Sequence, residues 1–284
     1  MTDDAGPILD NHLHLDPDHG RGLEAVDEFV RVGGTHLIVI NKPSWHLGVE
    51  ADTGEDFRPV FERTLEIVEE AATRLPGTAW AVLGVHPGLL SRLVDERGKS
   101  PQEAATIMQE GLEVAAEYIE RGQALGLKSG RPHYDVTDAV WDASNDVMRR
   151  AFELGAALEC AVQLHAESGS DFTTVGQLAA DAGLDPAQVV KHYASGDLEG
   201  VTPSVMSDRD RLRVAAERGA PFLMETNFVD DPDRPGAVLG PKTVPRRVDW
   251  LLEDGHEAAV RNAHVDTPRR VYGIDTLDTL EPVA

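Results

Sequence analysis

The chain has 284 residues, of which 26 are basic and 50 acidic, so its formal net charge is −24 at pH 7. This charge argues against nucleic-acid binding through an extended basic face, which needs clustered lysine and arginine, and against attachment to a membrane through a polybasic patch. A basic pocket inside an acidic shell is still compatible with these numbers, and a hydrophobic content of 41% is enough for a buried core.

Short apolar runs alternate with longer segments that have the spacing of amphipathic helices. The predicted strands cover residues 7–11, 36–41, 79–85, 124–128, 160–165, 189–192, 200–206 and 221–226. The predicted helices cover residues 23–32, 57–74, 101–121, 137–155, 174–182, 208–219, 245–253 and 256–262. The seventh strand is the weakest of these predictions, since Pro203 interrupts it and lacks the N–H group that a sheet uses.

Eight strands separated by helices predict a (β/α)8 TIM barrel in which residues 1–284 form a single domain. A doubly wound open sheet is the alternative α/β fold. No glycine-rich phosphate loop of the GxGxxG or Walker type follows the first strand, which removes the commonest reason for choosing the open sheet.

Cysteine content and the first residues bear on the compartment. Cys160 is the only cysteine, so no internal disulfide and no all-cysteine metal site can form. The first residues have neither a basic region nor a long apolar run, and no apolar stretch is long enough to span a membrane. We therefore expect no signal peptide and a cytoplasmic protein. The acidic excess, with 5 lysines against 21 arginines (26 − 5), is typical of adaptation to high salt and predicts a halophilic protein.

Polar residues gather where the predicted strands end, and in a TIM barrel these ends form the active face. His12 and His14 close the first strand as a His-x-His pair. Because residues i and i+2 of a strand point to the same side, both imidazoles can meet one cation. The later strand ends carry His86, Lys128, His165, His192, Glu225 and Asn227, with Asp230 and Asp231 just beyond.

A single histidine at a strand end is usually a hydrogen-bonded core or loop residue. Five histidines and one lysine at the predicted strand ends are better explained by a metal centre, because imidazole is a preferred ligand of zinc-like ions. Five other histidines lack this placement and are interpreted as surface or structural residues: His19, His36, His46, His256 and His264.

Lys128 needs a separate explanation, because an ammonium group has no lone pair with which to bind a cation. Three interpretations are open. The amine could be carboxylated by carbon dioxide, which yields an anion able to bridge two metal ions. It could replace a metal ion and pair with a substrate phosphate, or it could simply face a neighbouring carboxylate.

Several motifs together resemble the TatD-related branch of the amidohydrolase superfamily, in particular its archaeal subgroup, and with the composition they indicate a haloarchaeal source. They are NHLHLD at 11–16, GVHPG at 84–88, GRPHYDV at 130–136, QLHAE at 163–167, KHYA at 191–194 and METNFVDDPDRPGAVLGPKTVPRR at 224–247. These motifs span nearly the whole chain in the family's order.

The resemblance implies a metal-dependent hydrolase on a distorted TIM barrel that holds one or two divalent ions, such as Zn, Mn, Ni or Mg. It also implies that His12 and His14 bind the buried metal ion and that His165 and His192 bind the second. Lys128 lies where TatD-type members usually carry a bridging glutamate. It is similar to the carboxylated lysine of phosphotriesterase and lactonase relatives, which favours the bridging interpretation.

Asn227 departs from the family pattern. It lies where the resemblance places the aspartate of an ETD motif, which is a metal ligand and proton acceptor. An amide oxygen can bind a metal ion, but it cannot take a proton from water. Asp230 or Asp231 could act as a substitute base; otherwise the site would bind one metal ion, work slowly or be non-catalytic.

The substrate-binding candidates lie around the same strand ends. Arg131, His133 and Tyr134 directly follow the fourth predicted strand, and a guanidinium suits a phosphate or carboxylate. His86 ends the third strand, and Lys242 belongs to a short basic segment after the eighth. Arg131 could equally pair with a surface acid, and Lys242 could equally mark the solvated start of a helix.

Three functions therefore stay open. The first, implied by the family, is attack of a metal-activated water on a phosphodiester bond, in a small molecule or in DNA. The second is hydrolysis of small esters, lactones or amides, which a carboxylated Lys128 would support. The third is a weakly active or non-catalytic barrel, which Asn227 would explain.

Overall fold

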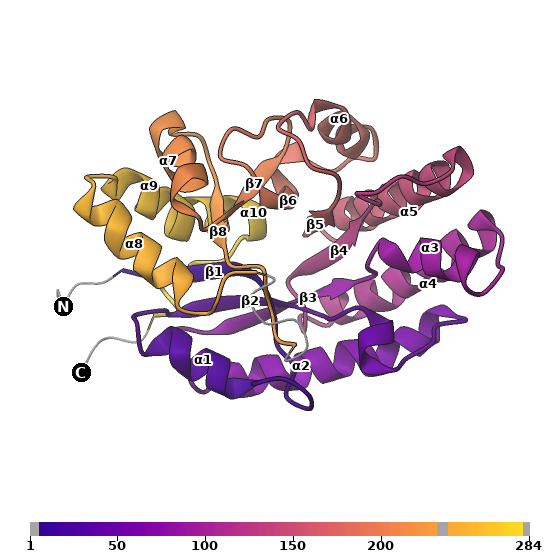
Figure 1. Ribbon diagram of the computed structural model, residues 1–284, viewed down its shortest axis with the longest axis horizontal. Helices are drawn as coiled ribbons and strands as arrows, with labels where there is room; N and C mark the ends of the chain where they lie inside the picture. Colours follow the sequence, from indigo (N-terminus) through magenta and orange to yellow (C-terminus); the bar gives the residue numbers. More distant parts are fainter. Residues whose placement is uncertain (1–5, 232–237, 281–284) are drawn as a thin grey trace.

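One sheet of nine parallel strands organises the structure, a computed structural model that describes residues 6–231 and 238–280. The strands follow the order β8-β7-β6-β5-β4-β3-β2-β1-β9, and the sheet curls as Figure 1 shows. Their bounds are β1 (Leu9–His14), β2 (His36–Ile40), β3 (Ala79–Gly84), β4 (Gly126–Gly130), β5 (Ala161–His165), β6 (Val189–Ala194), β7 (Thr202–Met206), β8 (Leu223–Glu225) and β9 (Phe228–Val229).

Strands β8 and β9 act as two halves of an eighth strand. β8 pairs with β7, whereas β9 pairs with β1 in the register Leu13↔Phe228. Only Thr226 and Asn227 separate the two halves, and Asn227 has a positive φ of 48°. The sheet therefore curls back on itself, with its irregularity at the closing strand. This confirms the predicted α/β fold of the TIM-barrel type.

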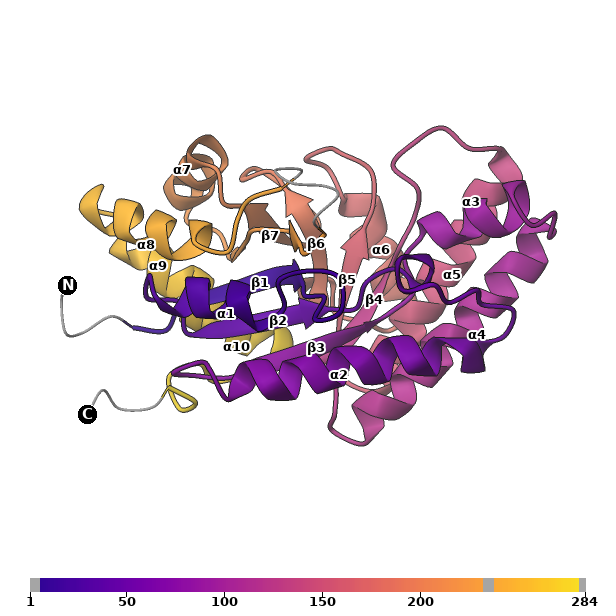
Figure 2. The same cartoon turned by 60° about the horizontal axis from the view of Figure 1, so that its bottom comes forward.

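Helices connect the strands and lie around the outside of the sheet (Figures 1 and 2). Their bounds are α1 (Leu23–Val30), α2 (Arg58–Ala72), α3 (Gly88–Asp95), α4 (Pro101–Glu120), α5 (Asp138–Ala157), α6 (Thr173–Asp181), α7 (Arg209–Arg218), α8 (Thr243–Glu253), α9 (Glu257–Arg261) and α10 (Thr267–Tyr272). Shorter turns are η1 (Ser44–Leu47), η2 (Gly54–Phe57), η3 (Pro186–Gln188) and η4 (Asn262–Asp266).

The predicted strands are all present, with ends that differ by a few residues. The first was predicted over 7–11, but β1 runs to His14, so the His-x-His pair lies inside the strand. Pro203 lies within β7 opposite Lys191, so the strand forms in spite of the missing N–H group. The predicted helices include neither α3 nor α10, which have 8 and 6 residues.

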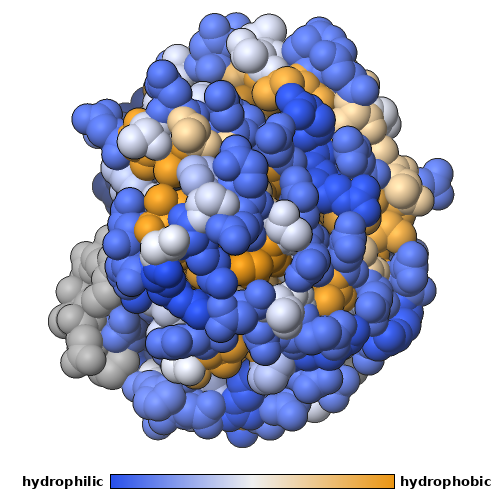
Figure 3. All heavy atoms as spheres, turned by 90° about the vertical axis from the view of Figure 1, so that its right-hand side faces the viewer, coloured by the Kyte–Doolittle hydropathy of each residue, from blue (hydrophilic) through white to orange (hydrophobic). Residues whose placement is uncertain are grey.

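The interior is filled by aliphatic and aromatic side chains, among which Phe29, Phe61 and Phe152 are almost fully buried. The face on the right-hand side of Figure 1 is mainly hydrophilic, with smaller hydrophobic areas between the polar residues (Figure 3). In the part of the chain that the structure describes, no helix is both long and apolar enough to cross a membrane.

Candidate metal centre

A cavity of about 270 Å³ opens where the carboxyl ends of the strands converge. It is lined by His12, His14, Lys42, Pro43, Trp45, His46, His86, Lys128, His133, His165, His192, Asn227, Val229 and Val238. Eight of these residues were marked by the sequence as site candidates, although they come from segments as far apart in the chain as β1 and the link between β8 and β9.

His12 and His14 keep one ring nitrogen available because the protein holds the other. Nδ1 of His12 lies 2.7 Å from Oε1 of Gln163, and Nδ1 of His14 lies 2.9 Å from the carbonyl oxygen of Ile40. Both partner atoms can only accept, so each Nδ1 carries the proton and each Nε2 keeps its lone pair. Metal-binding histidines are usually held in this way.

His12, His192 and Glu225 form a buried cluster whose possible ligand atoms all lie within 4.8 Å of one another. Nδ1 of His192 lies 3.5 Å from Oε1 of Glu225, and the rings of His12 and His192 stack with their centroids 4.1 Å apart. Among the described residues, Nδ1 of His192 and Oε2 of Glu225 have no hydrogen-bond partner although both are buried. Such atoms are rare in folded proteins, and a divalent cation would satisfy both. The residues present therefore fit a metal ion.

Three imidazoles form a hydrogen-bonded row across the cavity. Nε2 of His192 lies 2.8 Å from Nδ1 of His165, and Nε2 of His165 lies 2.9 Å from Nδ1 of His133. The ring of His86 packs beside His165 at a centroid distance of 4.6 Å. Because both nitrogens of His165 are engaged, this residue can bind a second metal ion only by giving up one of its hydrogen bonds.

Lys128 lies at the centre of the site and is only 3% exposed. Its Nζ atom is 3.5 Å from Nε2 of His12. Burial lowers the pKa of Lys128, and the negative charge of Glu225 acts in the opposite direction. Burial likewise raises the pKa of the Glu225 carboxyl, and the positive charge of Lys128 opposes that change.

Burial also keeps the imidazoles of the cavity neutral. It lowers the pKa of His14 to about 3, and it holds the pKa of His12 and His192 well below the usual value. The positive charge of Lys128 adds to the lowering in all three cases. Since neutral imidazole is the form that binds metal ions, these residues need no deprotonation at neutral pH.

Two residues with left-handed backbone lie near Glu225, one bound to its carboxylate and one two positions later in the chain. Asn227 has a φ of 48° and Tyr193 a φ of 56°. The N–H group of Tyr193 donates to Oε1 of Glu225 at 2.7 Å. Sparsely populated backbone conformations of this kind concentrate at functional sites. Asn227 itself lines the cavity and offers an amide, whereas the carboxylate beside His12 and His192 is that of Glu225.

Asp230 is not among the cavity residues and instead holds the loop that follows β1. Its carboxylate accepts hydrogen bonds from the backbone N–H groups of Asp16, Arg21 and Gly22 at 2.7–2.9 Å. Lys42 donates to the Asp16 carboxylate at 2.7 Å and to the carbonyl oxygen of Asp230 at 2.9 Å. Turning the Asp230 side chain into the cavity as a base would break three hydrogen bonds, so the arrangement favours a role in positioning this loop.

Arg131 pairs with Glu167, which matches its alternative interpretation as the partner of an acidic side chain. Its guanidinium binds both oxygens of the Glu167 carboxylate, and one of these bonds measures 2.8 Å from Nε to Oε2. It also donates to Oδ1 of Asn145 and lies over the ring of Trp141 at 4.5 Å from the centroid. The guanidinium is therefore already engaged on both its hydrogen-bonding edge and its face.

Tyr134 and Lys242 also lie outside the cavity lining. Tyr134 is 45% exposed, and its hydroxyl donates to Oγ of Ser91 at 2.9 Å. Lys242 lies 3.4 Å from Oε1 of Glu28 and directly precedes helix α8, which matches its alternative interpretation as the start of a helix. Of the five predicted substrate-binding residues, only His86 and His133 line the cavity.

Several residues at or near the site received no role from the sequence, and His46, interpreted there as a surface or structural residue, lines the cavity. Glu225 was noted at a strand end, but the family pattern drew attention to Asn227 instead. Gln163, two residues before His165, holds His12 through its amide. Trp45 forms one wall of the cavity and lies edge-on to His86 at 5.6 Å. Only Glu225 and Gln163 had a usable signal, because they are polar residues inside otherwise apolar predicted strands.

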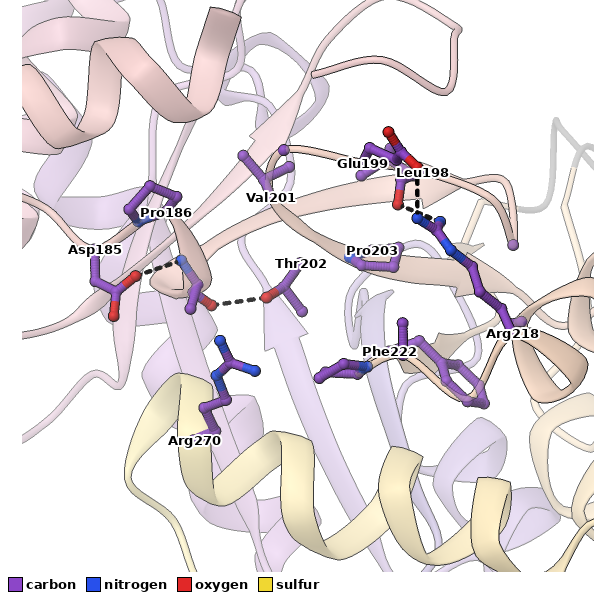
Figure 4. A pocket seen from close by; sticks show the side chains of 16 residues that line it. Asp185, Pro186, Leu198, Glu199, Val201, Thr202, Pro203, Arg218, Phe222 and Arg270 are labelled. Atoms are coloured by element: carbon purple, nitrogen blue, oxygen red, sulfur yellow. Dashed lines mark hydrogen bonds and ion pairs between the residues drawn. The ribbon is translucent and has the colours of Figure 1, made fainter. Parts of the chain in front are cut away.

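A larger cavity, of about 430 Å³, lies at the opposite ends of the strands, where β7 and β8 begin (Figure 4). Three of its charged groups are paired with one another or with the backbone: Arg218 binds Glu199 at 2.9 Å, and Asp185 accepts from the N–H of Ala187 at 2.8 Å. No histidine lines it. The smaller cavity is therefore the candidate for chemistry.

Comparisons with known proteins give the family and match the fold. The TatD related DNase family matches residues 9–273. An uncharacterised protein of Methanocaldococcus jannaschii is 35% identical over 281 residues, which cover 95% of this chain and 96% of that protein. Among solved structures, the organophosphorus hydrolase of Deinococcus radiodurans has a TM-score of 0.60 at 15% identity, covering 96% of this chain and 94% of the other. A lactonase of Listeria monocytogenes has a TM-score of 0.59 at 13% identity, covering 96% of each chain. The two structures share the fold, and the match over most of the chain shows that this protein belongs to the TatD-related DNase family.

Proposed function

We propose that the protein is a metal-dependent hydrolase that cleaves an ester bond in a small substrate held in the 270 Å³ cavity. The observation that carries this proposal is the pair of buried, unpartnered atoms, Nδ1 of His192 and Oε2 of Glu225, beside the available Nε2 of His12. These three residues would hold one divalent ion, with His14 beside them.

When bound, a divalent ion supplies Lewis acidity, which lowers the pKa of a coordinated water and steadies developing negative charge. The chain's own residues orient this centre and move protons. His12 and His14 are oriented by their Nδ1 hydrogen bonds. His133 is exposed at the outer end of the imidazole row, where it can exchange a proton with solvent and pass it to His165.

Lys128 acts, in this proposal, as a carbamate. Its lowered pKa favours the free amine, which attacks carbon dioxide; a C–N bond forms and the nitrogen loses a proton. The resulting anion would lie among the ligands, whereas an ammonium 3.5 Å from Nε2 of His12 would repel a cation there.

Two positively charged side chains near the cavity are already paired with carboxylates, so they are not available to bind a chain of phosphates. This favours a small substrate. Lys42 is bound to Asp16, and the guanidinium of Arg131 to Glu167. Apolar groups line the rest of the cavity: Pro43, Trp45, Val229 and Val238. We therefore propose esters or lactones as the substrate class, which is also the class named for the similar lactonase.

Hydrolysis of a phosphodiester at the end of a DNA strand is the second candidate. It is supported by membership of the TatD related DNase family. The net charge of −24 opposes it at low ionic strength, because the whole surface repels phosphate.

Metal analysis and a substrate panel test the proposal. Protein purified at high salt should contain stoichiometric Zn, Mn, Ni or Mg, and a protein that neither contains nor takes up such an ion would overturn it. The panel compares a lactone, an activated carboxylic ester and a 3′-labelled oligonucleotide at equal metal loading. Faster cleavage of the oligonucleotide would replace the first candidate by the second. Lys99→Ala, a change at a surface lysine paired with Asp52, is the control.

A further inference from the structure

A buried network of polar side chains lies beneath the metal centre and reaches helix α10 near the end of the described chain. Gln163 is fully buried on β5, and its Oε1 atom lies 2.7 Å from Nδ1 of His12. Its Nε2 atom donates to the carbonyl oxygen of Asn11 at 3.2 Å and to the hydroxyl of Tyr272 at 2.8 Å. The network therefore joins β1, β5 and α10.

The donors and acceptors of this network can be assigned in one consistent way. The Tyr272 hydroxyl accepts from Gln163, so it donates its own proton to Oδ1 of Asn11 at 2.9 Å. Asn11 in turn donates from Nδ2 to Oγ of Ser204 at 2.9 Å. With both N–H groups of Gln163 directed to oxygen acceptors, its Oε1 must face His12. A flipped amide would place an N–H group against Nδ1 of His12 and leave the Tyr272 hydroxyl facing a second acceptor.

We propose that Tyr272 is a positioning residue that fixes the ring tautomer of His12 through Gln163. The hydroxyl of Tyr272 selects the amide orientation of Gln163, and the amide oxygen then selects the His12 tautomer with its proton on Nδ1. The available nitrogen, Nε2, faces Lys128 in the cavity. The effect of Tyr272 on metal binding rests on the proposed function. The effect of Tyr272 on the His12 tautomer does not depend on a metal ion.

The Tyr272→Phe variant removes the hydroxyl and keeps the ring. Without this acceptor, the energy difference between the two orientations of the Gln163 amide should be smaller. His12 should then populate both tautomers. Groups that orient metal ligands typically contribute about 10-fold to 100-fold in affinity, so we expect zinc to bind about 10-fold more weakly. Tyr118→Phe is the matched control, because Tyr118 is buried and donates to Glu62 outside this network.

The test uses the metal-free full chain with ¹⁵N-labelled histidine and records the tautomer of His12 by long-range ¹H–¹⁵N correlation; zinc affinity follows by titration. The wild type and Tyr118→Phe should show one His12 tautomer, and Tyr272→Phe a mixture. A single unchanged His12 tautomer in Tyr272→Phe would overturn the inference. If the wild type binds no zinc, the proposed function fails, while the tautomer measurement still decides this proposal.

A second pair of variants covers the case in which Tyr272→Phe does not fold. Gln163→Glu keeps an acceptor for Nδ1 of His12 and should retain the single tautomer. Gln163→Met keeps the side-chain length without an acceptor and should lose it. The same tautomer in both variants would contradict the role given to this amide.

Discussion

Thr226 is joined to Asp10 by two hydrogen bonds that link β8 to β1 where the closing strand is irregular. Its backbone N–H donates to Oδ1 of Asp10 at 3.1 Å, and its hydroxyl donates to Oδ2 at 2.6 Å. β1 pairs with β9 only at Leu13 and His14, so at Asp10 a side chain, rather than the backbone ladder, links β1 to the closing strand.

Burial raises the pKa of Asp10 to about 7, so at a pH well above 7, where this carboxyl is ionised, replacing Thr226 by valine should destabilise the protein by about 1.5–3 kcal/mol, the range for hydrogen bonds to charged groups. The substitution keeps the shape but leaves one carboxylate oxygen of a fully buried residue without its donor. Urea unfolding measures the loss. Thr202→Val is the matched control, because Thr202 donates to the neutral carbonyl oxygen of Ala187 at 2.8 Å and should cost about 1 kcal/mol. Equal losses in both variants would argue against a special link at the closing strand.

Glu225→Gln should reduce metal content strongly while leaving the fold intact. Glutamine keeps an oxygen that can accept from the N–H of Tyr193, but it loses the negative charge beside Nδ1 of His192. Loss of a metal ligand exceeds the roughly 10-fold to 100-fold effect of a residue that only orients one. Metal analysis after dialysis is the measurement, and Glu199→Gln, at an exposed pair with Arg218, is the control. Full metal content in Glu225→Gln would remove Glu225 from the ligand set.

Lys128→Ala should abolish metal binding if the lysine bridges as a carbamate, and short carboxylic acids added to the buffer should partly restore it. Lys128→Glu should restore it without an additive, since a carboxylate would then occupy the bridging position. Lys191→Met is the control for a buried lysine, because the Lys191 ammonium donates to the backbone oxygen of His192. Unchanged metal content in Lys128→Ala would reject the bridge.

The fold could be predicted because its signals are local. Strand and helix spacing in the sequence places each element, and the parallel order follows from alternation, so the histidines meet at one end of the barrel. The pairing of charged groups could not be predicted in the same way. Arg131 meets Glu167 and Lys242 meets Glu28 because of how loops pack, and with 50 acidic residues in the chain no single partner stands out.

The roles of the residues around the closing strand were also hard to predict from the sequence. The resemblance of the segment Glu225–Asn227 to an ETD motif indicated that Asn227 replaces a metal-binding aspartate. It also suggested Asp230 as a substitute base. Asn227 does line the cavity, but the carboxylate beside His192 belongs to Glu225, and Asp230 is bound by three backbone donors of the loop after β1. Neither a left-handed residue nor a loop contact has a periodic signature in the sequence.

Asn227→Asp should raise turnover if a proton acceptor limits the reaction. Both residues tolerate the left-handed backbone, so the φ of 48° adds no new strain. A general base typically contributes about 100-fold or more to a rate, and a rise of at least about 10-fold in kcat is expected. Asp231→Asn in the same background is the control for the remaining acid of this segment. An unchanged or lower kcat would show that the chain already has its proton acceptor.

His264 should make the protein less stable in mild acid. Its Nδ1 atom accepts a hydrogen bond from the backbone N–H of Leu9 at 3.0 Å, and burial lowers its pKa from 6.5 to about 3. The unfolded chain therefore takes up a proton at a pH where the folded chain does not. The stability that neutral His264 contributes is fully present above pH 6.5, and it falls by up to about 1.4 kcal/mol per unit as the pH drops toward 3. His264→Asn keeps an acceptor for Leu9 without a titrating group, so its urea stability should fall less steeply between pH 6.5 and 4.5. Parallel curves for the two proteins would mean that His264 does not contribute to acid sensitivity.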